Sequence, residues 1–210
     1  DTIFDIFGNR WSSRKKIAVN TIRKNNPDVV GLQESKFKQV RDIRKGLPEY
    51  KCYSAGRNDG EEKGESCAIL FRKDRFKLID YGTFWFSDTP AKPGSKDWGN
   101  FPPRICSWVK LENVTNNEAF YVYNVHLDHL SQRSRRESTK LLTRKIANRK
   151  TEDPFIIMGD FNMKIDNPAM EYLCRGDIKD AWTTLFPEKE KGTGTAILNP
   201  SIGCGTLFWL

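Results

Sequence analysis

Hydrophobic side chains recur at helical spacing in three segments of the chain. We expect a first helix through about residue 25, with Ser12 or Ser13 as its N-cap and its end before Pro27. A second helix is expected over residues 36–45, and a third, basic one over residues 131–149. The side chains expected to face the core are Ile17, Ala18, Ile22, Val40, Ile43, Leu141, Leu142 and Ile146.

Short apolar runs between and after these helices predict strands. Residues 28–33 and 154–158 are continuous apolar runs, which are typical of buried strands. Loops that contain glycine and proline, such as 88–103, separate the others. These further strands are expected at 51–55, 66–71, 76–86, 104–111 and 119–126. Two short elements follow at 171–174 and 180–185, which the sequence assigns neither to helix nor to strand. Strands grouped between helices predict sheets covered by helical layers.

The composition agrees with a folded domain and excludes several protein classes. The 210 residues are 38% hydrophobic and 12% aromatic, which argues against a disordered chain. No apolar run approaches the roughly 20 residues that span a bilayer, so we expect no transmembrane segment. The opening residues lack a basic and apolar leader. Five cysteines without C-x-x-C spacing are interpreted as mostly buried thiols, which favours an intracellular compartment.

The net charge of +8 predicts an affinity for anions without identifying them. Nucleic acid, a phosphorylated sugar, anionic lipid and plain solubility all fit. The cations of the helix at 131–149 form either a nucleic-acid patch or a solvated helix face, and the second is favoured. The aromatic stretch 84–86 either lines a cleft or belongs to the core, and the core is favoured.

Polar side chains follow three of the apolar strands. Glu34 follows the strand at 28–33, His126 ends the strand at 119–126, and Asp160 and Asn162 follow the strand at 154–158. In an extended segment residues i and i+2 point the same way, so Asp160 and Asn162 are expected to address one point. Gly159 leaves room for a ligand near the backbone.

This set of side chains suits the hydrolysis of a phosphate ester. A hard cation such as Mg²⁺ takes one or two carboxylates plus water and substrate, and Glu34 fits that role. Asp160 can accept a proton from the attacking water while Asn162 holds water or phosphate by a hydrogen bond. His126 can donate to a nonbridging oxygen. Each residue alone has an ordinary explanation as a strand end, core histidine or turn; their joint occurrence favours a site.

The chain resembles the endonuclease/exonuclease/phosphatase superfamily, whose members include nucleases, deadenylases, sphingomyelinases and phosphatases. The motifs that carry the resemblance are Pro27–Glu34, Asn124–Leu127 and Gly159–Asn162, and it covers roughly residues 9–195. Further motifs at 9–11, 56–60, 64–65, 82–90 and 103–106 resemble a largely uncharacterised branch.

The resemblance implies an α/β fold, a four-layer αββα sandwich of two mixed sheets flanked by helices. It implies Mg²⁺ or Mn²⁺ as cofactor, Glu34 and Asp160 as metal ligands, and a phosphorylated substrate, either a small molecule or nucleic acid. His126, Asp160 and Asn162 are the catalytic candidates. Arg104 matches a phosphate-binding position, with a surface arginine as the alternative. Weaker candidates for the substrate rim are Arg57, Glu65, Asp128, His129 and Arg135.

Two pieces of the family pattern are missing from the sequence. Relatives open with a strand that ends in a metal-binding Asn and close with an Asp-His segment, and the tail 196–210 has no Asp. We therefore expect one domain over 1–210 that is incomplete at both ends. Two hypotheses stay open: a metal-dependent phosphoesterase, or a catalytically impaired member that acts as a binding module.

Overall fold

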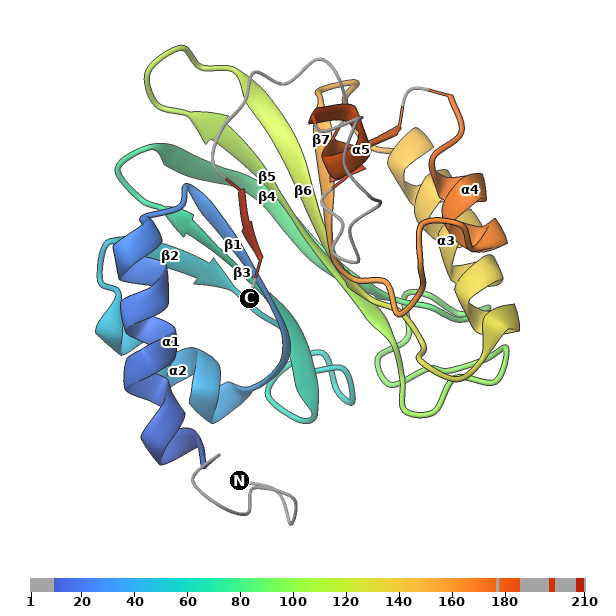
Figure 1. The fold of residues 1–210 in the computed structure, drawn as a ribbon, viewed down its shortest axis with the longest axis horizontal. Coiled ribbons are helices and arrows are strands. Elements are labelled where there is room, and N and C mark those ends of the chain that lie inside the picture. Colours follow the sequence, from blue (N-terminus) through green and yellow to red (C-terminus); the bar gives the residue numbers. More distant parts are fainter. Residues whose placement is uncertain (1–9, 177, 186–196, 199–206, 210) are drawn as a thin grey trace.

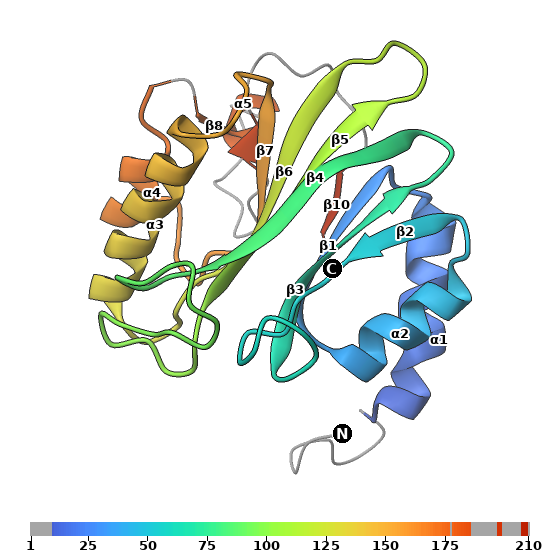
Figure 2. The ribbon, with the colours of Figure 1, turned by 180° about the vertical axis from the view of Figure 1, so that it is seen from behind.

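Two β-sheets pack face to face, and helices cover both outer sides (Figure 1, Figure 2). The structure is a computed structural model that describes residues 10–176, 178–185, 197–198 and 207–209. This arrangement confirms the predicted αββα sandwich.

The first sheet has the strand order β10-β1-β3-β2. Its strands are β1 (Val29–Lys36), β2 (Tyr50–Tyr53), β3 (Glu65–Arg72) and β10 (Leu207–Trp209). β1 runs antiparallel to β3 and parallel to β10. Helices α1 (Trp11–Asn25) and α2 (Phe37–Gly46) lie on its outer side (Figure 1).

The second sheet has the order β4-β5-β6-β7-β9-β8. Its strands are β4 (Phe76–Trp85), β5 (Ile105–Asn113), β6 (Ala119–His126), β7 (Phe155–Asp160), β8 (Lys179–Asp180) and β9 (Ile197–Leu198). β6 and β7 are parallel, and α3 (Gln132–Ala147) is the crossover that parallel strands require. Helix α4 (Pro168–Leu173) packs beside α3, and α5 (Ala181–Leu185) follows β8.

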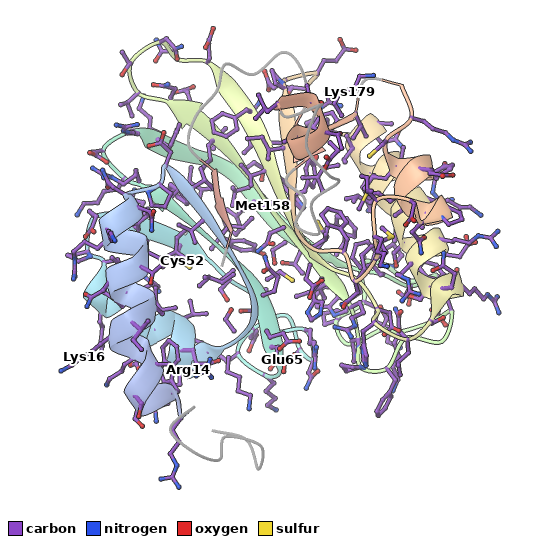
Figure 3. The ribbon with its side chains drawn as sticks, in the orientation of Figure 1. Arg14, Lys16, Cys52, Glu65, Met158 and Lys179 are labelled. Carbon is purple, nitrogen blue, oxygen red and sulfur yellow. The ribbon has the colours of Figure 1, made fainter. Side chains whose placement is uncertain are left out.

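Apolar side chains from both sheets fill the space between them. Val29, Phe71, Val109 and Met158 belong to this layer, where Met158 is labelled in Figure 3. These side chains alternate with outward ones along each strand, as the period of two requires. The sheets are therefore held together mainly by buried apolar surface.

The buried amide of Asn124 also joins the two sheets. Its Nδ2 donates to the carbonyl oxygens of Leu32 (3.1 Å) and Ala68 (2.9 Å) in the other sheet. Its Oδ1 accepts a 2.7 Å hydrogen bond from Nε2 of Gln33. In the sequence, the signal for this role of Asn124 is a polar amide inside an apolar strand, two residues before His126.

Helix α1 differs from the sequence prediction at two points. Its N-cap is Arg10, which makes no side-chain capping hydrogen bond, so the prediction of Ser12 or Ser13 was wrong. Ile17 is 65% exposed, whereas Ile22 is completely buried. The helix is rotated so that Trp11 and Ile22 face α2 and the sheet, and the Trp11 indole donates to Asp42 of α2. Ile17 falls outside that stripe.

The other core predictions were largely correct. Helix α3 begins after Ser131, whose hydroxyl accepts from the Ser134 N–H. The predicted inward residues of α2 and α3 are buried, and so is the aromatic stretch 84–86, which belongs to the core. Cys67 and Cys106 are buried free thiols and Cys52 and Cys174 are half-buried, while Cys204 lies outside the described residues. No helix among the described residues is long and apolar enough to cross a membrane.

Candidate active site

Three predicted site residues meet where β6 and β7 end, opposite an irregular part of β1. Nε2 of His126 lies 3.8 Å from Oε1 of Glu34 and 3.9 Å from Oδ2 of Asp160. In the register of the parallel pair, His126 is directly opposite Asp160. Glu34 reaches them from the facing sheet. The chain therefore brings two carboxylates and an imidazole together from three distant segments.

A bulge in β1 orients the Glu34 side chain toward His126. The prediction placed Glu34 just after a strand, but it lies inside β1, at a bulge between Leu32 and Ser35. Its φ is +56°, in the left-handed region that non-glycine residues seldom adopt. Bulges commonly re-aim a side chain beside a site. The Glu34 side chain is 66% exposed and so is accessible to a ligand from solvent.

The Gly159–Asn162 segment turns sharply at the end of β7. Asn162 has a φ of +51°, so the argument from extended geometry that paired it with Asp160 was wrong. Instead, Oδ1 of Asp160 accepts from the Asn162 backbone N–H (2.9 Å), and Nδ2 of Asn162 donates to the Leu127 carbonyl (2.9 Å). The backbone N–H and one side-chain N–H of Asn162 are thus already engaged. The turn fixes Asp160 with Oδ2 toward His126.

Gly159 is required for strand packing. Its φ is +137°, and a Cβ there would lie 2.0 Å from the Val125 carbonyl oxygen. The expected room for a ligand is therefore occupied by the neighbouring strand β6. The glycine lets β7 approach β6 closely enough to set Asp160 beside His126.

Arg104, just before β5, is the buried cation of the site and is 3% exposed. Its Nη1 donates to Nε2 of His126 (2.8 Å) and its Nη2 to Nδ1 of His129 (2.6 Å). Its Nε is 3.3 Å from Oδ2 of Asp128. Because a guanidinium only donates, Nε2 of His126 is the acceptor and the ring proton is on Nδ1 in this arrangement. Arg104 is therefore no surface arginine.

Burial and positive charge keep His126 neutral. Loss of solvent lowers the pKa of His126 to about 3, and the nearby cations Arg104 and Arg57 act in the same direction. The contacts of His126 with Glu34 and Asp160 are consequently not ion pairs at neutral pH. A neutral imidazole exchanges hydrogen bonds but carries no positive charge to the site.

The carboxylate of Asp128 binds the Arg104 guanidinium on its buried side. The carboxylate is fully buried, so the prediction that it lies at the rim was wrong. Its Oδ1 accepts from the backbone N–H groups of Leu130 (2.9 Å) and Ser131 (2.8 Å). Burial alone would raise the pKa of Asp128, but these N–H groups and Arg104 outweigh it and lower the pKa below its usual range. Asp128 is thus held ionised beneath the guanidinium.

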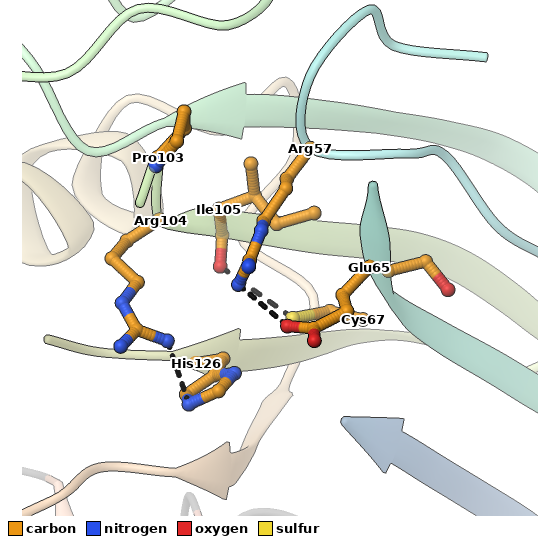
Figure 4. A pocket seen from close by; sticks show the side chains of 8 residues that line it. Arg57, Glu65, Cys67, Pro103, Arg104, Ile105 and His126 are labelled. Atoms are coloured by element: carbon orange, nitrogen blue, oxygen red, sulfur yellow. Dashed lines mark hydrogen bonds and ion pairs between the residues drawn. The ribbon is translucent and has the colours of Figure 1, made fainter. Parts of the chain in front are cut away.

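Two of the other rim candidates, Arg57 and Glu65, contact each other beside the site. Arg57 and Glu65 form a 2.7 Å ion pair and line a cavity of about 10 Å³ together with Arg104 and His126 (Figure 4). That volume is near the lower limit for one water molecule. Nε of Arg57 is buried and has no hydrogen-bond partner among the described atoms.

His129 is exposed and contacts Arg104, so it lies at the rim as predicted. Arg135 instead donates to the Asp128 carbonyl (2.8 Å) and to Oε1 of Gln132 (3.0 Å). Its guanidinium holds the turn after β6 in place. In this arrangement it supports the site and does not reach its surface.

The oxygen atoms available at the site fit a hard divalent cation. No cluster of three or more His, Cys, Asp or Glu in the described part of the chain forms a ready metal site. Mg²⁺, however, usually keeps several waters and takes only one or two carboxylates. Glu34 and Asp160 are 66% and 39% exposed in their side chains and approach the same atom of His126. The two accessible carboxylates of Glu34 and Asp160 therefore equal the number of protein ligands that Mg²⁺ usually takes.

Comparison with known proteins identifies the family to which this fold belongs. The family model described as "Endonuclease/Exonuclease/phosphatase family" matches residues 4–207, a wider range than the 9–195 of the sequence motifs. An uncharacterized protein of Acanthamoeba polyphaga mimivirus is 30% identical over 161 residues, 73% of this chain and 59% of that protein. Drosophila melanogaster Protein angel is 24% identical over 201 residues, 89% of this chain and 54% of that protein. The chain thus spans little more than half the length of these curated relatives.

The chain covers a larger share of one solved structure than of these curated relatives. The mannosyl-6-phosphatase of Bacteroides thetaiotaomicron superimposes with a TM-score of 0.83 at 30% identity, covering 91% of this chain and 78% of that one. Its fold is the same sandwich. The extent of the family match, together with this superposition, decides the assignment. The chain belongs to the endonuclease/exonuclease/phosphatase family.

Proposed function

We propose that this protein is a phosphoesterase that hydrolyses a small phosphate monoester with the help of a divalent cation. The observation that carries the proposal is the convergence of Glu34 and Asp160 on Nε2 of His126, at 3.8 and 3.9 Å, beside the buried Arg104. The likeness to a mannosyl-6-phosphatase supports a sugar phosphate as the substrate class. The net charge of +8 suits any anionic substrate.

Glu34 and Asp160 would hold the cation, either Mg²⁺ or Mn²⁺, through carboxylate oxygens. When bound, such an ion neutralises charge that develops on the phosphoryl oxygens. Water attacks phosphorus, the bond from phosphorus to the ester oxygen breaks, and the leaving alcohol takes up a proton. In this proposal Asp160 accepts the proton of that water.

Arg104 and His126 supply the hydrogen bonds to the phosphate. Nη1 of Arg104 donates to Nε2 of His126. An incoming phosphate oxygen can take over this N–H, because charged acceptors make the stronger hydrogen bond. Nε2 is then released, and the neutral ring can donate from it after its proton moves from Nδ1. Donors preset around a developing negative charge are a large source of rate enhancement.

The direct test is phosphate release by the purified chain with Mg²⁺ or Mn²⁺. Mannose 6-phosphate, glucose 6-phosphate and 4-nitrophenyl phosphate test the monoester. For the diester, release of 4-nitrophenol from bis(4-nitrophenyl) phosphate and shortening of single-stranded DNA are followed instead. We expect metal-dependent release from monoesters, lost in Glu34→Gln and retained in Glu171→Gln, an exposed residue of α4. Faster cleavage of bis(4-nitrophenyl) phosphate would instead make the protein a phosphodiesterase, and faster cleavage of the DNA would make it a nuclease.

The competing hypothesis is a binding module without catalysis. It predicts no hydrolysis of any of these substrates at any metal concentration. Release that persists undiminished in Glu34→Gln would instead point to a contaminating phosphatase. Either outcome overturns the proposal.

A further inference from the structure

A second arginine, Arg57, lies beside the residues that bind phosphate in the proposed function. It belongs to the loop before β3, and it lines the cavity of about 10 Å³ together with Arg104 and His126 (Figure 4). The two guanidinium groups reach this cavity from different sheets, because Arg104 directly precedes β5. Two cations therefore converge on a space that has room for a single oxygen atom.

The backbone of Arg57 is fixed on both sides. Its N–H donates to the Glu65 carbonyl oxygen (2.9 Å), and its own carbonyl oxygen accepts from the indole N–H of Trp85 (2.6 Å). Trp85 is the last residue of β4 and is 4% exposed. The arginine is therefore held in position before a ligand arrives, which lowers the ordering cost of binding.

The described chain satisfies the Arg57 guanidinium only in part. Its Nη1 lies 2.7 Å from Oε2 of Glu65, whereas its Nε is buried and has no hydrogen-bond partner among the described residues. Buried donors are nearly always paired, so this guanidinium calls for a further acceptor. The side chains of Arg57 and Glu65 are 15% and 26% exposed, so a ligand oxygen can approach the pair from solvent.

The charges around Arg57 favour an anion as that acceptor. Burial lowers the pKa of Arg57, and the positive charge of Arg104 acts in the same direction, against the carboxylates of Glu65 and Glu34. Arg57 stays protonated all the same, because a guanidinium does not lose its proton in proteins. An anion that lies between the two guanidinium groups offsets their mutual repulsion.

We propose that Arg57 is a further phosphate-binding residue that selects phosphate monoesters over diesters. This inference rests on the function proposed above. A monoester has three non-bridging phosphate oxygens, whereas a diester has two. Arg104 and His126 donate to two of these oxygens, and Arg57 donates to the third, which only the monoester has. A guanidinium suits this role because its hydrogen bonds to phosphate are charge-assisted.

The test compares the double variant Arg57→Gln/Glu65→Gln with Glu65→Gln. The double variant is needed because Arg57→Gln alone leaves the Glu65 charge unpaired beside the phosphate. Relative to Glu65→Gln, it should lose about tenfold or more in kcat/KM for 4-nitrophenyl phosphate. It should lose as much in affinity for inorganic phosphate, measured by calorimetry with Mg²⁺ present. Cleavage of bis(4-nitrophenyl) phosphate should be the same in both variants.

Two controls accompany these measurements. Arg41→Gln makes the same substitution at an exposed arginine of α2, and it should leave turnover and phosphate affinity at the wild-type level. The affinity for Mg²⁺ shows whether the rest of the site is intact, and it should be equal in all variants.

The alternative roles of Arg57 give different results. If the double variant equals Glu65→Gln in monoester turnover and phosphate affinity, Arg57 only balances the charge of Glu65. If both esters lose equally, or Mg²⁺ binding is lost with them, Arg57 only supports the fold. Either result overturns the proposal, and so does a wild type that binds no phosphate. A wild type that binds phosphate but hydrolyses nothing refutes the proposed function instead, and the phosphate affinities then decide the role of Arg57.

Discussion

Removal of the Asp128 carboxylate should destabilise the protein more than any nearby surface change. Asp128 is completely buried and Arg104 is 3% exposed. Asp128→Ala leaves the guanidinium without its carboxylate and leaves the N–H groups of Leu130 and Ser131 without an acceptor. Breaking one side of a buried pair costs about 3–5 kcal/mol. Asp128→Asn keeps an oxygen for the two N–H groups, so it should cost less, about 1–3 kcal/mol.

Urea denaturation followed by tryptophan fluorescence measures these differences, and their pH dependence tests the cause. The folded state lowers the pKa of Asp128, so its charge stabilises the fold above the unfolded value of about 3.9. That contribution is lost as the pH falls through the lower folded pKa. The gap between wild type and Asp128→Asn should therefore be full at neutral pH and should narrow below about pH 4. A gap that stays constant down to acid pH, or no gap at all, would refute the reasoning.

Three further changes test other parts of the structure. His126→Gln should lower kcat for a phosphate monoester by a factor of about 10²–10³, the usual loss for one hydrogen-bond donor to the developing charge, while the melting temperature stays near that of wild type; unchanged turnover would remove His126 from the mechanism. Gly159→Ala should destabilise the fold by at least about 3 kcal/mol, because its Cβ would lie 2.0 Å from the Val125 carbonyl oxygen, and a wild-type urea midpoint would contradict this. Asn124→Leu should cost about 1–3 kcal/mol, since it leaves the carbonyls of Leu32 and Ala68 unpaired between the sheets, and thermal denaturation that matches wild type would argue against that role.

The sequence predicted the fold well because periodicity and strand order carry most of that information. The runs at 28–33 and 154–158 were recognised as buried strands, and both lie in the sandwich. The phase of α1 was not predictable in the same way. Apolar residues lie on more than one side of that helix, and the contact between Trp11 and Asp42 of α2, which helps set its rotation, depends on tertiary structure.

The identities of the site residues were recognisable from the sequence, but their roles were not. Glu34, His126 and Asp160 do meet, as their positions after apolar strands suggested. The bulge at Glu34 and the left-handed turn at Asn162 are local backbone features with no clear sequence signal. Asp128 looked like a rim residue because it follows a site histidine, yet its carboxylate points inward to Arg104. Contacts between segments distant in sequence decide such orientations.

Titration of Mg²⁺ by calorimetry into wild type, Glu34→Gln, Asp160→Asn and the control Glu171→Gln tests the central claim most directly. We predict that wild type and the control bind Mg²⁺ alike, and that each of the other two substitutions weakens binding about tenfold or more. A chain that takes up no Mg²⁺, or one that binds it equally well without either carboxylate, would contradict the claim that Glu34 and Asp160 share one cation.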